Sequence, residues 1–140
     1  MNCLSLAAAF VIAATPVLSD VVSYDCALKG WENKGWIPER VLFSVEAEKG
    51  NARVYDGLVE HAKGRPIAAD IKSLKSGKYR LNWKLNLPSD GAGDIRVNYT
   101  ATIDPSSLTF NLRAKFPMVN ASNNPRGDGR CQIMKGKTLF

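Results

Sequence analysis

The chain has 140 residues and a net charge of +6, from 19 Lys and Arg against 13 Asp and Glu. This length suits one compact domain, and a hydrophobic content of 45% with 23% charged residues argues against disorder. One histidine and three cysteines exclude most histidine-based catalysis and most zinc chemistry. The excess of positive charge favours anionic partners.

The start of the chain has the pattern of a secretory signal peptide. Residues 4–18 form an uncharged apolar run, and the first charged side chain is Asp20. The run is shorter than the roughly 20 apolar residues of a membrane-spanning helix, and Pro16 breaks it before a small-residue site. We expect residues 1–19 to be a signal peptide cleaved after Ser19. Residues 20–140 would then be a single exported domain, in the periplasm or outside the cell. The alternative is a buried N-terminal strand or helix.

Cleavage would remove Cys3 and leave Cys26 and Cys131. Two remaining cysteines in an oxidising compartment are expected to form a disulfide bond. Closing so long a loop would stabilise the fold by roughly 4–5 kcal/mol in the chain-entropy model. The alternative is two separate buried thiols.

Strict alternation of apolar and polar residues dominates the second half of the chain. It covers residues 78–87, 95–103 and 108–116, with turn residues between them. Three consecutive strands of this kind, each with one apolar face, predict a β-meander.

The first half predicts shorter strands and no helix. We expect residues 57–64 to form an irregular connection and a last strand to cover about 130–135. Further strands are expected at residues 21–29, 41–47, 52–56 and 67–74. The predicted fold is therefore all-β: about eight antiparallel strands in an up-and-down meander that closes into a barrel. A bond between Cys26 and Cys131 would join the first and last strands, which favours the barrel over the alternative, a β-sandwich.

A register for the meander predicts a basic patch on its polar face. Pairing Lys78 with Asp104 sets Lys84 beside Asn98, and a two-residue turn after Asp104 sets Arg113 opposite Asn98. The patch would contain no acidic residue and could bind an anion; the alternative is an ordinary solvated face. Its four members are Lys84, Arg96, Arg113 and Lys115.

Two tryptophans occur in a repeated Lys-Gly-Trp between the first two strands. Trp31 and Trp36 could line a barrel mouth and contact a ligand or partner, or could simply plug the core. His61 is read as a surface histidine, and no catalytic residue, metal site or cofactor is predicted. Most aromatic residues alternate onto the face opposite the cations, so nucleic acid is not an expected partner.

Four segments carry a resemblance: YDC at 24–26, GWIPERV at 35–41, YDG at 55–57 and RGDGRC at 126–131. In these features the chain resembles small exported β-rich proteins of alphaproteobacteria, a resemblance that implies no activity, ligand or catalytic residue. In architecture it is similar to calycins and lipocalin-like barrels. It lacks their Gly-x-Trp signature, because its tryptophans directly follow Gly30 and Gly35.

These observations favour a non-enzymatic exported barrel that binds a small apolar or amphipathic ligand, or an anionic envelope component. An interior ligand needs a cavity on the order of 300 Å³ or more, so a barrel filled by Trp83, Tyr99 and Phe110 would exclude it. The alternative is a protein-interaction module, such as a secreted protease-inhibitor-like barrel. A third reading is a small outer-membrane barrel, because alternation alone does not say which face is inside.

Overall fold

The structure is a computed structural model that describes residues 11–14, 20–31, 35–91, 93–118 and 124–140. Most of the predicted signal peptide, with its cleavage point and Cys3, lies outside these ranges. Of that segment, residues 11–14 form no helix or strand, and Val11 and Ile12 are exposed. No helix in the described part of the chain is long and apolar enough to cross a membrane.

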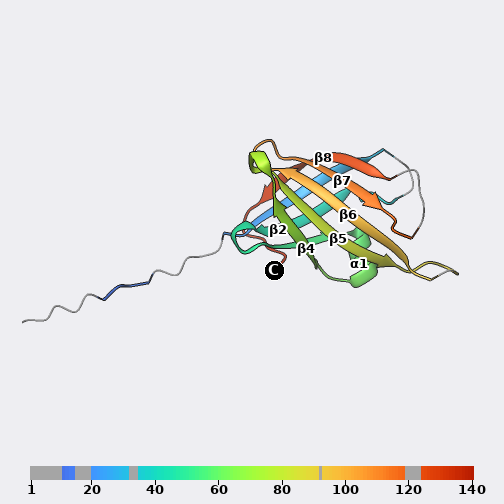
Figure 1. Ribbon diagram of the computed structural model, residues 1–140, viewed down its shortest axis with the longest axis horizontal. Coiled ribbons are helices and arrows are strands. Elements are labelled where there is room, and N and C mark those ends of the chain that lie inside the picture. The colour runs from blue at the N-terminus through green and yellow to red at the C-terminus, as the bar shows by residue number, and fades with distance from the viewer. Residues whose placement is uncertain (1–10, 15–19, 32–34, 92, 119–123) are drawn as a thin grey trace, which may run out of the picture.

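Eight antiparallel strands form a closed barrel in which each strand pairs with its neighbours in sequence and the last pairs with the first (Figure 1). The predicted all-β, up-and-down barrel is therefore confirmed, and the β-sandwich alternative is wrong. The strands are β1 (Val22–Gly30), β2 (Arg40–Glu46), β3 (Asn51–Asp56), β4 (Ile67–Ser73), β5 (Tyr79–Leu87), β6 (Ile95–Asp104), β7 (Thr109–Lys115) and β8 (Arg126–Met134). Single 3₁₀ turns, η1 (Ala47–Lys49) and η2 (Lys75–Gly77), follow β2 and β4.

The apolar positions of the alternating strands point into the barrel. Phe43 lies at the centre of a stack, with its ring centroid 4.8 Å from that of Tyr24 and 5.4 Å from that of Phe110. Trp83 stacks on Tyr99 at 5.4 Å, and all five rings are buried. The alternation thus sends the polar residues of β5, β6 and β7 outward, where any binding surface on these strands must lie.

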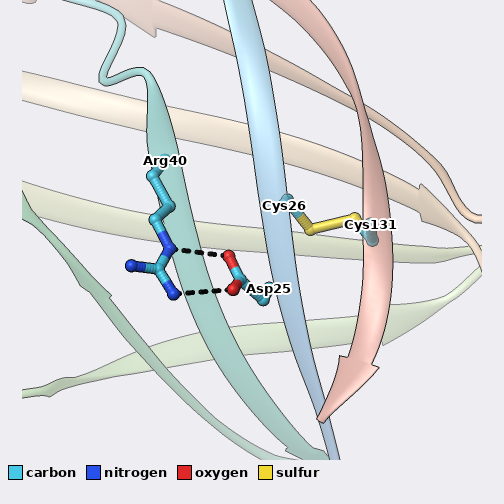
Figure 2. The surroundings of a disulfide bond; sticks show 4 residues. All are labelled: Asp25, Cys26, Arg40 and Cys131. Carbon is cyan, nitrogen blue, oxygen red and sulfur yellow. Dashed lines mark hydrogen bonds and ion pairs between the residues drawn. A yellow bond between two sulfur atoms is a disulfide. The ribbon is translucent and has the colours of Figure 1, made fainter.

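The closing pair of strands, β1 and β8, carries the predicted disulfide. Cys26 and Cys131 are direct register partners, and their sulfur atoms are bonded (Figure 2). Both cysteines are buried, so the link lies against the core. On the outer side of β1, Asp25 accepts two hydrogen bonds from the guanidinium of Arg40 at 2.7 and 2.8 Å (Figure 2).

The prediction of an irregular connection after β3 was wrong. Residues Gly57–Lys63 form the helix α1, which is capped by Asp56 at its N-terminus and by Gly64 at its C-terminus. The Asp56 carboxylate accepts hydrogen bonds from the backbone N–H groups of Leu58 and Val59, and Gly64 has the positive φ that commonly follows a helix. The helix buries one residue, Val59, against the barrel end.

The predicted register was right on one side of β6 and wrong on the other. Lys84 does pair with Asn98, but Asn98 faces Lys115 rather than Arg113. The shift of two residues arises in the turn after β6, where Leu108 takes a left-handed conformation (φ 56°) and donates its N–H to the carbonyl of Asp104. The loop is therefore four residues long instead of two.

Different segments of the chain cover the two ends of the barrel. One end, which we call the α1 end, carries α1 (Figure 1). Trp36 and Phe116 contact each other at this end and pack against the core. At the other end the chain returns over the outside of β2, where the Leu139 N–H donates to the Ser44 hydroxyl. This hydroxyl also bonds that of Ser23, and both serines are buried although they point outward.

Candidate functional site

A groove of about 880 Å³ runs across the outer face of β4, β5, β6 and β7. Three of the four predicted patch residues, Lys84, Arg113 and Lys115, line it. The groove forms where β4 and β5 stop pairing. Only four residue pairs join these two strands, and the last is Asp70↔Asn82. Beyond this pair the two strands separate towards the α1 end, and the outward side chains of Ala68 and Lys84 border the gap.

The register sets the spacing of the cations in this groove. Lys84 and Lys115 both flank Asn98 across adjacent strands, which places their backbones two strand spacings apart, about 10 Å. Arg113 lies in the next row, opposite Thr100. The three cations thus surround amide and hydroxyl groups that can donate to an anion or accept from a hydroxyl.

Two details of the predicted patch differ in the structure. Arg96 pairs with Asn86 nearer the end of the hairpin and does not line the groove. The patch was also expected to contain no acid, but Asp70 lines the groove beside Asn82. Sequence reasoning missed Asp70 because its pairing with β5 could not be assigned without knowing the length of the turn at 74–78.

The two tryptophans predicted at a barrel mouth have different positions. Trp36 is half-buried; its ring meets Phe116 edge-on at 4.8 Å, and its carbonyl accepts a hydrogen bond from the Tyr99 hydroxyl. It therefore closes the α1 end as part of the core. Trp31 instead lies on the outer surface beside β8, with 68% of its area exposed.

The titratable groups near the α1 end are buried and structural. Burial raises the pKa of Asp56, although its bonds to the backbone N–H groups of Leu58 and Val59 act in the opposite direction. Burial, and then the nearby carboxylate of Asp56, raise the pKa of Tyr99. Both groups have partners that fix them: Asp56 begins α1 and Tyr99 holds Trp36.

The described residues bring together no group of side chains that could hold a metal ion. Across the ranges that the structure describes, no three His, Cys, Asp or Glu residues come together to hold a metal ion. His61 is exposed on α1 and does not line the groove. The arrangement in the groove is suited to holding a ligand by charge and hydrogen bonds.

The fold and the groove define a class: a closed, eight-stranded up-and-down barrel with a packed aromatic interior and a polar, basic hollow on its outer wall. No family model, no curated protein and no solved structure matches the chain.

Proposed function

We propose that this protein is a non-enzymatic, exported barrel that binds an anionic component of the cell envelope in the groove across β4–β7. The observation that carries the proposal is the set of three cations, Lys84, Arg113 and Lys115, around a hollow of about 880 Å³. None of the three forms an ion pair in the part of the chain that the structure describes. A bound phosphate or carboxylate would supply the missing partner.

Export is part of the proposal, and the disulfide supports it. A structural disulfide persists in oxidising compartments and is rare in the cytosol. The exposure of Val11 and Ile12 agrees with a leader that contributes nothing to the core.

The interior supports a small apolar ligand poorly. Trp83, Tyr99 and Phe110, the residues expected to decide this question, are buried in ring stacks. Trp83 Nε1 is the one buried side-chain polar atom without a hydrogen-bond partner in the described ranges, which is too little to orient an amphipathic molecule. The ligand therefore belongs on the outside of the barrel.

The side-chain orientation also argues against the outer-membrane reading. A lipid-facing band needs apolar residues pointing outward. On β6 and β7 the outward positions are instead polar or charged. They are Arg96, Asn98, Thr100, Thr102, Thr109, Asn111, Arg113 and Lys115.

The experiment compares two variants of equal charge. In the groove variant Lys84, Arg113 and Lys115 are replaced by Ala; in the control variant the exposed Lys75, Lys78 and Lys135 are replaced. The control lysines lie beyond the far ends of the strands, away from the α1 end. Both variants lose three positive charges, so a difference between them reports position and not net charge.

Binding is measured by calorimetry with two probes that separate the sources of the anion, trigalacturonate for carboxylates and phosphatidylglycerol vesicles for phosphates. The groove variant should bind the preferred probe at least about tenfold more weakly, because a hydrogen bond to a charged group contributes about 1.5–3 kcal/mol. The control should stay within about twofold of the wild type. Equal losses in both variants, or no binding of either probe, would overturn the proposal. Native mass spectrometry of the exported protein adds a further arm: a bound protein in place of an anion would favour the interaction-module alternative.

A further inference from the structure

The outer wall beside the groove holds a second feature, centred on Trp31. Its indole Nε1 donates to Asp128 Oδ2 at 2.9 Å, and its backbone N–H donates to the carbonyl of Arg126 at 3.0 Å. The guanidinium carbon of Arg126 lies 5.3 Å from the centre of the ring. Trp31 is thus highly exposed and yet held at both its backbone and its side chain. Such a residue can bind without a further loss of rotamer entropy.

Two hollows border Trp31. One, of about 520 Å³, is lined by Lys29, Gly30, Trp31 and Asp128. The other, of about 280 Å³, includes Asn111 and Arg113 of β7 and Arg126 of β8. The ring therefore lies between two hollows. Asp128 lines both, together with Lys29 in the larger one and with Arg113 and Arg126 in the smaller one.

Arg113 connects this feature to the groove, because it lines both the groove and the smaller hollow. Register partners continue the connection across four strands, from Asn82 through Thr100 and Arg113 to Arg126. The β5 and β8 backbones are three strand spacings apart, about 14 Å. A continuous polar row thus runs from the middle of the groove to Trp31.

The pairing of Arg113 with Arg126 also indicates an anion. The two arginines lie directly opposite each other on antiparallel strands, and like charges in this position are destabilising. Within the described ranges neither forms an ion pair. An anionic group between them would remove the repulsion.

We propose that Trp31 is the stacking subsite of one extended track that begins in the groove, and that the ligand is an acidic oligosaccharide, a chain of sugar rings that carry carboxylates. The proposal rests on the anion-binding function proposed above and names its ligand class. A pyranose ring has an apolar face of C–H groups that can lie on the indole, and edge hydroxyls that can donate to Asp128 and Asn111. Its carboxylates would lie at the arginines and lysines.

The acidic members of the track favour a sugar over other anionic chains. Asp70 and Asp128 lie in the groove and beside Trp31, where they would repel the closely spaced phosphates of a nucleic acid. The same carboxylates accept hydrogen bonds from hydroxyls. A protein partner is less favoured, since one exposed Trp among polar residues lacks the apolar centre of a protein–protein interface.

The test measures the affinity of hexagalacturonate by calorimetry for the wild type, Trp31→Ala, Trp31→Phe and the groove variant, with neutral cellohexaose and hexathymidylate as matched probes. Trp31→Ala should weaken hexagalacturonate binding about tenfold, as expected for an aromatic hot spot, and Trp31→Phe should recover most of this loss because it retains a ring. Hexagalacturonate should also shield the wild type from acrylamide quenching. This signal reports Trp31, because Trp36 is half-buried and Trp83 is 3% exposed.

The outcomes separate this inference from the function on which it rests. If an anionic probe binds in the groove while Trp31→Ala has no effect and quenching is unchanged, the extended track is wrong and the groove proposal stands. Binding that needs Trp31 but survives in the groove variant would overturn the single track. If hexathymidylate binds as tightly as hexagalacturonate, the assignment of the ligand as a sugar is overturned. If none of the three probes binds, the proposal of an acidic-oligosaccharide ligand is overturned. The measurement with phosphatidylglycerol vesicles then decides whether the groove binds an anion at all.

Discussion

The β1–β8 and β5–β6 strand pairs have ladders of similar length, eight and nine residue pairs, but are built in different ways. The β5–β6 pair is a hairpin whose alternating apolar residues pack on one another next to a short loop. The β1–β8 pair joins segments 105 residues apart, and it combines a disulfide with two glycines, Gly127 and Gly129. A distant pairing must offset the entropy of closing a long loop, whereas a hairpin closes a short one. The pair that closes the barrel is therefore reinforced by a covalent bond and by close backbone contact, neither of which the β5–β6 hairpin has in the described structure.

The disulfide gives the largest expected effect. Replacing both Cys26 and Cys131 by Ala should lower the free energy of unfolding by about 4–5 kcal/mol, because the unfolded chain loses its longest constraint. Denaturant unfolding of the variant, with reduced wild-type protein as control, checks this. A loss below about 1 kcal/mol would show that β1 and β8 hold together without the covalent link.

Gly129 tests the close approach of the same two strands. A Cβ added at Gly129 would overlap the carbonyl oxygen of Ala27 on β1, and one at Gly127 would lie 2.7 Å from a methyl carbon of Ile37. We expect Gly129→Ala to cost about 3 kcal/mol, at the upper end for overpacking, since backbone must move. The control is Gly57→Ala, where a Cβ meets no atom within 4 Å. Equal unfolding midpoints for the two variants would contradict the close packing.

The N-terminal cap of α1 is a contact between residues close in the sequence, in contrast to the β1–β8 pair. Asp56→Ala removes the acceptor of two backbone N–H groups and should cost about 1 kcal/mol, whereas Asp56→Asn retains a capping side chain and should cost less. Because the pKa of Asp56 is raised above 3.8 in the fold, its ionisation destabilises the native state as pH rises through that folded value. The deficit of Asp56→Asn relative to the wild type should therefore be larger at pH 3 than at pH 7. Thermal melts at both values measure this, and a larger deficit at pH 7 would show the opposite sign.

The Asp25–Arg40 pair should have the smallest effect. The hydrogen bonds from Arg40, more than the charge alone, hold the pKa of the Asp25 carboxyl below 3.8. The pair is partly exposed, so Asp25→Asn should lower the Tm at pH 7 by only about 2 °C. A lowered native pKa contributes stability above about pH 4 that is lost as pH falls through the native value, so wild type and variant should converge near pH 2. The control is Asp90→Asn at an exposed loop position, which removes the same charge and leaves the bonds between Asp25 and Arg40 intact.

Pairings between strands that are neighbours in the sequence could be predicted more fully than contacts between residues that are far apart in it. Alternation located β5, β6 and β7, and the charges of Lys78 and Asp104 selected the correct β5–β6 register. The β6–β7 register depends on the left-handed conformation of Leu108. Leucine rarely adopts this conformation, so the sequence could not predict it. The helix α1 was missed because seven residues with one buried side chain give no helical periodicity, although Asp56 and Gly64 were readable as its cap signals.

The same contrast applies to the site. Lys84, Arg113 and Lys115 could be placed on one face because they lie on neighbouring strands of the meander. The predicted last strand covered only about residues 130–135, because Arg126-Gly127-Asp128-Gly129 has the composition of a turn. These four residues instead form the start of β8. Trp31 and Asp128 are 97 residues apart in the sequence, and no spacing in the sequence could indicate the contacts of Trp31 with Asp128 and Arg126.

The position of β8 at the end of the chain also affects how the barrel is made. Until residues 126–134 are available, β1 and β7 remain two open edges with unpaired backbone groups, which can pair with other chains. Contacts of this sequence separation form late and slow the folding of all-β domains. The last strand therefore decides both when the barrel is complete and for how long the unfinished sheet is exposed to aggregation.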